Sequence, residues 1–391
     1  MKITFWLSFF IVFYTFAGYG ILLYFLIRIR RALKGKRVIP AVIDDELPEC
    51  TLVVAAYNEE HFMSAKIANC LQLEYPAGKL KFVFITDGSN DGTPDIIAKY
   101  PQIQLLHQPQ RAGKIAAVHR AMEYVNTEIA VFTDANTFLN NKAIINICRH
   151  YADKTVGCVA GEKRVQVDEH ADASAAGEGF YWKYESALKK WDSELYSVVG
   201  AAGELFSVRR SLYIDVPADT VLDDFMISML IAEQGYRIVY EPEAYASETA
   251  SENVSEELKR KIRIAAGGIQ SILRLPGLFN PFKFPVLSFQ YVSHRVLRWT
   301  VTPFLLLLTF VLNGLIAYGT GELFYQLFFA AQLCFYLLAI LGLIMEKRQI
   351  RIKALFVPYY FCVMNYAVLM GIVRYFTKKQ SAVWEKAQRK V

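Results

Sequence analysis

Three short apolar segments each end in a cluster of polar residues, a pattern typical of parallel strands whose carboxyl ends bind a ligand. The segments are Thr51 to Ala56, Lys81 to Ile85 and Glu128 to Thr133. They run into Tyr57-Asn58-Glu59-Glu60, Thr86-Asp87-Gly88-Ser89-Asn90-Asp91-Gly92 and Asp134-Ala135-Asn136. Aspartates at strand ends are also ordinary turn formers. Because three clusters fall on one expected sheet edge, the pattern favours a ligand site there.

The middle of the chain, between Pro48 and about Tyr245, alternates short apolar strands with helical stretches. This alternation predicts an α/β fold with a mainly parallel sheet and helices on both faces. The further strands are expected at Ile103 to Leu106 and Val156 to Ala160, and the helices near Thr93 to Tyr100, Ala112 to Val125 and Lys142 to Tyr151. Neither a GxGxxG sequence after the first strand nor a Walker-type phosphate loop is present, so a nucleotide would be bound by other means.

Both ends of the chain are strongly apolar. The run from Phe5 to Ile27 carries no charged residue and is long enough to cross a bilayer. Six cations follow it, namely Arg28, Arg30, Arg31, Lys34, Lys36 and Arg37. The positive-inside rule therefore predicts an external N-terminus and a cytosolic body. The net charge of +6 is matched by these six cations, which favours contact with anionic lipid over nucleic acid.

Three more apolar segments lie near the C-terminus. Trp299 to Tyr318 and Leu323 to Met345 predict a membrane hairpin, and Ala354 to Val373, which contains Pro358, is a fourth candidate. A complete fourth span would place the basic tail outside, against the charge rule. A re-entrant or interfacial course would keep the tail inside, and both alternatives stay open.

Two features at the expected sheet edge suit a diphosphate. The loop Arg111-Ala112-Gly113-Lys114 opens a helix, so its amides and the Lys114 ammonium are able to face an anion. Asp134 and Asn136 offer a carboxylate and an amide oxygen, which are ligands for a hard cation. A surface lysine at a helix start is the simpler alternative for Lys114.

The order of these motifs, from about Pro48 to Arg274, resembles a membrane-anchored inverting glycosyltransferase of family 2 with a GT-A fold, in the group of bacterial poly-N-acetylglucosamine and cellulose synthase-like enzymes. The resemblance implies a nucleotide-sugar donor, a UDP-sugar, and Mg²⁺ or Mn²⁺ at Asp134 and Asn136. The implied donor-binding residues are Ala56, Tyr57, Asn58, Glu59, Asp87, Lys114 and Asp134. Two positions depart from the family pattern, since Thr86 and Asn136 stand where the family has acids.

Asp223 and Asp224 open a helix, where adjacent acids usually act as a cap. In the family this pair carries the catalytic base, which the resemblance assigns to Asp224 with Asp223 beside it. The glycine-rich segment Val199 to Phe206 is similar to the family's acceptor-side strand and places Gly203 and Glu204 at the acceptor.

The segment from Val165 onward predicts a loop over Asp168 to Glu178 and a helix over Gly179 to Leu195, whose aromatic residues are assigned to packing. An amphipathic basic helix is expected from Asn253 to about Leu273 and is typical of a membrane surface. The synthases of the family carry a QxxRW motif there, of which only an arginine is kept, and Arg263 is placed on the acceptor side. Transfer of a single sugar and processive synthesis both stay open.

These observations predict an integral, multi-pass protein of the inner membrane with a cytosolic catalytic domain. The expected parts are a transmembrane helix (1–28), a basic linker (29–47), the GT-A domain (48–250), interfacial helices (251–298), transmembrane segments (299–374) and a basic tail (375–391). The expected partners are the sugar nucleotide, a lipid-linked or cell-surface glycan and the bilayer. A non-catalytic transporter or scaffold is disfavoured because ionisable residues are missing inside the C-terminal spans.

Overall fold

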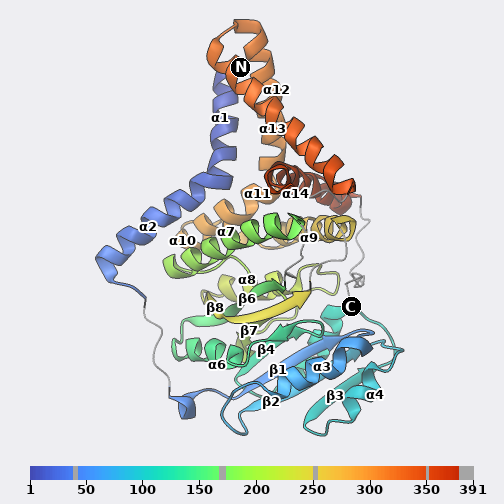
Figure 1. Ribbon diagram of the computed structural model, residues 1–391. Helices are drawn as coiled ribbons and strands as arrows, with labels where there is room; N and C mark the ends of the chain where they lie inside the picture. The colour runs from blue at the N-terminus through green and yellow to red at the C-terminus, as the bar shows by residue number, and fades with distance from the viewer. Residues whose placement is uncertain (38–42, 167–172, 250–253, 349–351, 378–391) are drawn as a thin grey trace.

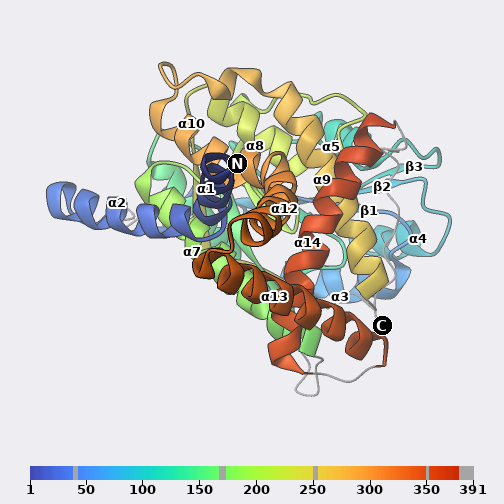
Figure 2. The ribbon, with the colours of Figure 1, turned by 90° about the horizontal axis from the view of Figure 1, so that it is seen from above.

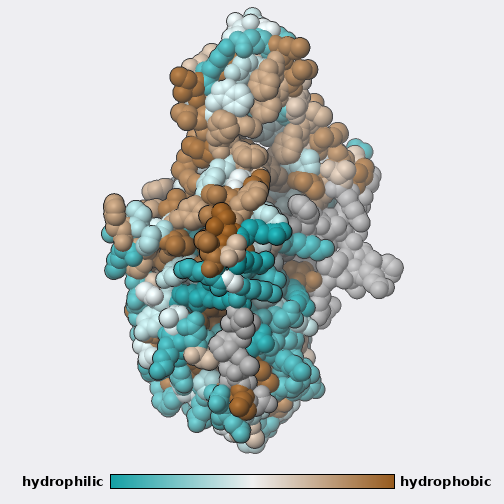
Figure 3. Space-filling view, turned by 90° about the vertical axis from the view of Figure 1, so that its left-hand side faces the viewer, coloured by the Kyte–Doolittle hydropathy of each residue, from teal (hydrophilic) through white to brown (hydrophobic). Residues whose placement is uncertain are grey.

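The computed structural model describes residues 1–37, 43–166, 173–249, 254–348 and 352–377. It has two levels, an α/β body below and a group of helices above (Figure 1). The surface of the upper level is mostly apolar, whereas the surface of the body is mostly polar (Figure 3). This division agrees with a protein that is partly embedded in a bilayer.

A mixed eight-stranded sheet forms the body, in the order β3-β2-β1-β4-β7-β6-β8-β5. The strands are β1 (Cys50–Ala56), β2 (Leu80–Asp87), β3 (Ile103–Gln108), β4 (Ile129–Asp134), β5 (Phe138–Leu139), β6 (Val156–Gln166), β7 (Leu205–Arg209) and β8 (Arg237–Thr249). The first four predicted strands are parallel, as expected, and β7 runs antiparallel to both of its neighbours. Ala55 is level with Asp134, and Ala56 with Thr86, so the polar strand ends share one edge.

The sheet is buried on both faces, and its alternating side chains feed two apolar clusters. Val53 and Ala55 of β1 belong to one cluster, and Leu52 and Val54 belong to the other. The first cluster includes α5 (Lys114–Met122) and α8 (Asp223–Glu233) and continues to Trp299 and Val368. The second lies under α3 (Glu60–Leu71), α4 (Thr93–Ala98) and α6 (Ala143–Cys148).

Two expectations for the second half of the body are wrong. The helix α7 (Ala173–Leu195) begins inside the segment expected to be a loop, of which 168–172 lie outside the described residues. Small alanines favour helix once a packing partner is present, and α7 packs on α2 (Tyr19–Lys34). The glycine-rich segment is also not a strand before Leu205, since 199–204 form a loop with Gly200 at φ 84°.

Four helices of the described chain are long and apolar enough to cross a membrane, namely Lys2–Lys34, Thr302–Thr320, Leu323–Lys347 and Ala354–Phe376. The first comprises α1 (Lys2–Phe13), the π-helical turn η1 (Tyr14–Gly18) and α2, and it bends so that α2 lies over the body (Figures 1 and 2). The others are α12 (Thr302–Thr320), α13 (Leu323–Lys347) and α14 (Lys353–Phe376). The helix α12 packs on both α1 and α13.

The helix α14 differs from the other C-terminal helices in direction. Seen from above, α1 and α12 point toward the viewer, whereas α14 is seen along its length (Figure 2). It packs extensively on α9 (Val254–Arg274), the predicted amphipathic helix. A Cβ on Gly371 would lie 2.5 Å from the Cβ of Ala265, so a glycine there permits this close approach. Between α9 and α12 lie η5 (Pro276–Phe279), α10 (Pro285–Tyr291), η6 (Val292–Val296) and α11 (Leu297–Trp299).

Candidate active site

Asp87, at the end of β2, organises the loop that precedes α5. Its carboxylate accepts hydrogen bonds from the backbone amides of Ala112 (2.9 Å) and Gly113 (2.7 Å). Gly113 has a φ of 100°, a conformation that other residues rarely adopt. The Asp87 side chain therefore holds the backbone of Ala112 and Gly113, directly before α5, in place. It is buried, which makes it a support for the predicted phosphate loop.

The polar ends of β1 and β2 are joined to each other. The Asn58 side chain donates to the Asn90 side chain (2.8 Å) and accepts from the Asn90 amide (3.0 Å). The Asn58 amide donates to the Ser89 hydroxyl at 3.1 Å. Next to this junction the Arg111 guanidinium lies 3.8 Å from the centre of the Tyr57 ring. The Arg111 guanidinium thus stacks on the Tyr57 ring, and the two side chains form a flat platform at the polar edge of the sheet.

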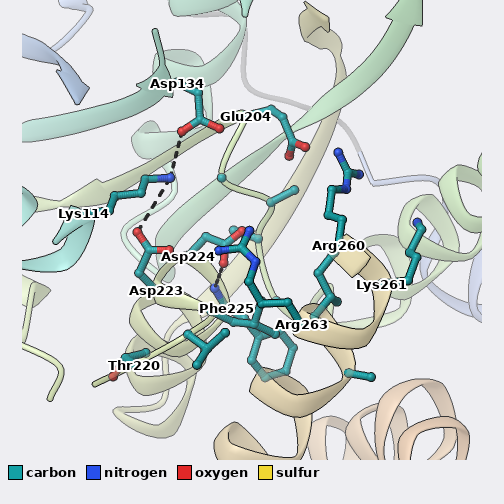
Figure 4. Close-up of a pocket in the computed structure, with 18 of the residues that line it drawn as sticks. Lys114, Asp134, Glu204, Thr220, Asp223, Asp224, Phe225, Arg260, Lys261 and Arg263 are labelled. Carbon is teal, nitrogen blue, oxygen red and sulfur yellow. Dashed lines mark hydrogen bonds and ion pairs between the residues drawn. The ribbon is translucent and has the colours of Figure 1, made fainter. Parts of the chain in front are cut away.

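Lys114, the first residue of α5, contacts acids from two different elements (Figure 4). Its ammonium lies 2.8 Å from Asp134 and 3.9 Å from Asp223. Burial alone would lower the pKa of Lys114, but Asp134 and then Asp223 outweigh it and hold that pKa above its usual range. The side chain is therefore a permanent cation between the end of β4 and the start of α8.

Asp134 and Asn136 both line the cavity beside Lys114. Together they offer one carboxylate and one amide oxygen, a set that suits Mg²⁺ or Mn²⁺ only when further oxygens come from a ligand. No group of three or more potential protein ligands exists in the described part of the chain. The residues fit a divalent cation that is held jointly with a diphosphate, rather than a metal bound by the protein alone.

Asp224 lies close to this cluster, at the first turn of α8 (Figure 4). Burial raises the pKa of its carboxyl, and the neighbouring Asp223 raises it further, to about 7. A Cβ on Gly203 would lie 3.3 Å from the Asp224 carboxylate and 3.4 Å from the Lys114 ammonium. Because Gly203 has no side chain, the space next to both groups stays open for a reactant.

The packing behind Asp224 fixes where its carboxylate lies. The Phe225 ring packs against Gly200, where an added Cβ would come within 2.2 Å of the ring. The same ring also packs on Trp299, with the two ring centres 5.5 Å apart. A Cβ on Gly267 of α9 would come within 2.9 Å of Val221. The Gln270 side chain of α9 also accepts from the Val221 amide at 3.0 Å. The helix α9 therefore positions the segment that carries the two aspartates.

Glu204, the other acceptor-side prediction, belongs to a buried ionic network. Its carboxylate is 2.7 Å from the Lys163 ammonium of β6, and Lys163 also pairs with Glu248 of β8. Arg260 of α9 lies 3.4 Å from Glu248. Burial alone would raise the pKa of Glu204, but Lys163 outweighs it and holds that pKa well below its usual range. Glu204 is thus a fixed anion, unsuited to accepting a proton near neutral pH.

Arg263 points from α9 toward Asp224 (Figure 4). Burial lowers the pKa of its guanidinium, while Asp223 raises it. Among the described residues it has no hydrogen bond or ion pair with another side chain. Arg263 therefore adds a buried cation to the cavity beside the two aspartates of α8.

One cavity of about 350 Å³ brings most of these residues together. It is lined by Glu59, Lys114, Asp134, Asn136, Gly203, Glu204, Asp223, Asp224 and Arg263 from the predicted set. The lining does not include four other predicted residues, which lie at or just after the carboxyl ends of β1 and β2, namely Ala56, Tyr57, Asn58 and Asp87. The same cavity extends to Glu185, Lys189, Arg295 and Trp299, which the sequence did not place in the site, and to Met364, Ala367 and Val368 of α14.

Lys66 is a further residue that the sequence did not reveal. It lies on α3, is fully buried, and donates to the Thr137 carbonyl (2.6 Å) and the Thr133 hydroxyl (3.1 Å). Thr133 in turn donates to the Glu204 carbonyl at 2.9 Å. This network holds the turn after β4, which carries Asp134, and connects it to the loop that contains Glu204. The sequence analysis expected no helix over Glu60–Leu71, so a single lysine in that segment gave no signal of this role.

Comparison with known proteins shows where the fold and sequence recur. The sequence pattern of the family described as glycosyl transferase family 2 matches residues 51–216. Poly-beta-1,6-N-acetyl-D-glucosamine synthase of Staphylococcus aureus is 26% identical over 293 residues, which are 72% of this chain and 68% of that one. The synthase of the same name from Staphylococcus epidermidis is 24% identical over 234 residues, 57% of this chain and 55% of that one.

A solved structure has the same fold over almost the whole chain. It is a mannosyltransferase from Pyrobaculum calidifontis in complex with GDP-Man and Mn²⁺, with a TM-score of 0.70 and 23% sequence identity. The match covers 96% of this chain and 99% of that one, so the shared architecture includes the helices outside the sheet. The GT-A fold expected from the sequence is confirmed.

Proposed function

This chain is a glycosyltransferase that carries a family 2 domain over residues 51–216, and we propose that it moves a sugar from a nucleotide diphosphate donor, a UDP-sugar, to a lipid-linked or cell-surface glycan acceptor. The observation that carries the proposal is the position of Asp224. A carboxyl with a pKa of about 7 lies next to a permanent ammonium and an open glycine surface. That arrangement suits an inverting transfer, in which Asp224 is the base on one side of the sugar and Lys114 stabilises the leaving diphosphate on the other side.

The donor side would use the residues at the carboxyl ends of β1, β2 and β4. The platform of Tyr57 and Arg111 is suited to the base of the nucleotide, and the amides at the start of α5 are suited to the diphosphate. Lys114 would stabilise the negative charge that grows on the diphosphate as the bond to the sugar breaks. The Asp87 carboxylate would keep this loop in place, because it accepts hydrogen bonds from the amides of Ala112 and Gly113.

Asp134 and Asn136 would hold the divalent cation together with the donor. A bound Mg²⁺ or Mn²⁺ would supply positive charge at the diphosphate. The presence of Mn²⁺ in the Pyrobaculum complex supports this interpretation. Asp134 has a second role, because its ion pair with Lys114 orients the ammonium toward the cavity.

Asp224 would act as the general base. The acceptor hydroxyl oxygen forms a bond to the anomeric carbon, its proton passes to the Asp224 carboxylate, and the carbon–oxygen bond to the diphosphate breaks. The nucleoside diphosphate leaves with the bonding electrons, and the anomeric configuration inverts. Asp223 assists indirectly, since its charge raises the pKa of Asp224, and it also lies near Lys114.

The membrane arrangement follows from the helices and the charges. We place the catalytic body in the cytosol beneath an inner membrane, with α1, α12 and α13 crossing it. The helix α14 lies across their direction on α9 (Figure 2), which favours the interfacial course left open by the sequence. That course keeps the basic tail on the cytosolic side.

A second candidate is processive synthesis of a polysaccharide. It is favoured by the staphylococcal relatives, which are named as polysaccharide synthases. The loss of the glutamine and tryptophan of the QxxRW motif, with only Arg263 pointing at the site, favours transfer of single sugars instead.

The proposal is tested with the purified full-length chain in detergent. We expect one nucleotide sugar from a panel of UDP-sugars, GDP-sugars and TDP-sugars to release its nucleoside diphosphate in the presence of Mg²⁺ or Mn²⁺. Membrane extract supplies the acceptor, and Asp224→Asn serves as the inactive control. Release that is equal in both proteins, or absent with every donor, contradicts the proposal.

A further inference from the structure

We propose that the first membrane helix is a working part of the active site, because its Tyr19 side chain holds Arg295 in the cavity wall through a chain of buried polar residues. This inference rests on the proposed function and assigns Tyr19 and His294 to positioning on the acceptor side. Tyr19 is the first residue of α2, directly after the bend formed by η1. It is 0% exposed, so its hydroxyl lies inside the protein and not in lipid.

Two π-helical turns meet at this bend, η1 of the membrane helix and η6. Turns of this kind are frequent at functional sites. The Tyr14 hydroxyl of η1 lies 2.7 Å from the Ser293 hydroxyl of η6, and the Tyr184 hydroxyl of α7 donates to the Phe16 carbonyl of η1 at 2.8 Å. A Cβ on Gly20 would lie 2.9 Å from the Tyr184 hydroxyl, so a glycine there permits α2 to pack closely on α7. The bend is therefore held against both α7 and η6.

Asp192 of α7 connects Tyr19 to the second of these turns. Its carboxylate accepts hydrogen bonds from the Tyr19 hydroxyl and from the Gln290 side chain. His294 of η6 lies between two carboxylates, with Nδ1 2.6 Å from Asp192 and Nε2 3.2 Å from Glu185. Asp192 and His294 are 0% exposed, and Glu185 is 2% exposed. Packing alone would not require these charges, since apolar residues often replace buried ion pairs without loss of stability.

Glu185 is the point at which this network reaches the catalytic cavity. Its carboxylate lies 2.8 Å from the Arg295 guanidinium and 2.9 Å from that of Arg298. Burial alone would raise the pKa of Glu185, but Arg295 and then His294 outweigh it and hold that pKa well below its usual range. Glu185 is therefore a fixed anion, and it anchors Arg295, which also lines the cavity.

Arg295 connects the network to the surroundings of the base. Its guanidinium lies 5.4 Å from the centre of the Trp299 ring, and Trp299 packs on Phe225, the neighbour of Asp224. Among the described residues the buried Nε of Arg295 has no hydrogen-bond acceptor, so an oxygen of the acceptor substrate is able to bind there. Loss of the Tyr19 hydroxyl should therefore disturb the acceptor side of the cavity and leave the donor side, at the ends of β1, β2 and β4, unchanged.

The inference is tested by removing one hydroxyl from the membrane helix of the full-length protein. Tyr19→Phe removes the hydrogen bond to Asp192 and keeps the ring. Tyr24→Phe is the matched control, because its partly exposed hydroxyl lies on the same helix and accepts from Arg28. We measure transfer to membrane extract, and the Kd of the nucleoside diphosphate by calorimetry. Tyr19→Phe should lower kcat/KM for transfer about tenfold, the effect of one lost hydrogen bond to a charged group, and change the Kd less than about twofold. Tyr24→Phe should change neither quantity by more than about twofold.

A double variant separates positioning from a general loss of stability. Because Tyr19 acts through Arg295, Tyr19→Phe should lower transfer no further in a chain that already carries Arg295→Gln. Losses that multiply in the double variant, a Kd that rises as much as transfer falls, or an unchanged rate in Tyr19→Phe overturns the inference. Where Tyr19→Phe does not fold, His294→Asn, which keeps a donor toward Asp192, decides by the same comparison. A wild-type protein that releases no nucleoside diphosphate is a separate result, which refutes the proposed function itself.

Discussion

The exchange Asp224→Asn tests the chemistry most directly, because it removes a base and keeps the shape of the side chain. The new amide oxygen would still accept the Phe225 amide, which donates to Asp224 at 2.8 Å, so the start of α8 should stay in place. A positioned base contributes about 10²- to 10⁴-fold to such a reaction. We therefore expect kcat for transfer to fall by that factor, while the Kd of the donor changes less than threefold.

The pH dependence gives a second, independent measure of the same residue. Only the carboxylate form accepts a proton, and with a pKa of about 7 its fraction rises from about one tenth at pH 6 to about nine tenths at pH 8. Transfer by the wild-type protein should therefore increase about tenfold over this range. The residual activity of Asp224→Asn should lack that increase.

Asp223→Asn serves as the matched control for this interpretation. Its charge raises the pKa of Asp224, second only to burial, so its removal should lower that pKa and move the rise in activity to lower pH. The assay is the initial rate of nucleoside diphosphate release at saturating donor from pH 5 to 9, with the donor Kd measured by calorimetry. Full turnover by Asp224→Asn, or a wild-type profile that is flat between pH 6 and 8, would refute the assignment of the base.

Other predictions concern the residues around the base. Asp134→Ala should raise the donor KM at least tenfold and increase the Mn²⁺ concentration needed for half-maximal rate, and activity that persists after chelation would contradict its role. Lys66→Met should lower the free energy of unfolding by about 1–3 kcal/mol, since it leaves the buried Thr137 carbonyl without its partner, and should also raise the donor KM; a stability loss with an unchanged KM would restrict Lys66 to a structural role. Gly267→Val should lower kcat more than tenfold because its side chain collides with Val221, whereas Gly319→Val, at a site with no atom within 4 Å, should be neutral.

The donor side could be anticipated from the sequence because its signals are local. A strand that ends in an acid places that acid at a sheet edge, so the strand pattern predicted a ligand site at this edge, and the resemblance to family 2 added the donor roles of Asp87 and Asp134. The position of Lys114 at a helix start allowed a role at an anion, and the resemblance to the family selected that role over a plain surface lysine. Their partnership did not follow, since the contact between Lys114 and Asp223 joins residues more than a hundred positions apart, and spacing within one element says nothing about such a pair.

The acceptor side depended on tertiary packing and was therefore less predictable. The basic residues of α9 suggested a membrane surface helix, yet Arg260 and Lys261 pair with acids of the protein and Arg263 turns toward the base. Two glycines, Gly267 and Gly268, allow this close packing, and the sequence analysis gave them no role. Their function appears when the partner side chains Val221 and Trp299 are known.

The position of α9 also connects the membrane to the base. One face of α9 holds Val221 through Gly267 and Gln270, and another face is in contact with α14 through Ala265 and Gly371. A displacement of α14 would therefore act, through α9, on the segment that carries Asp224. A bulky exchange at Gly371 should therefore lower kcat, although this residue is not in the cavity lining.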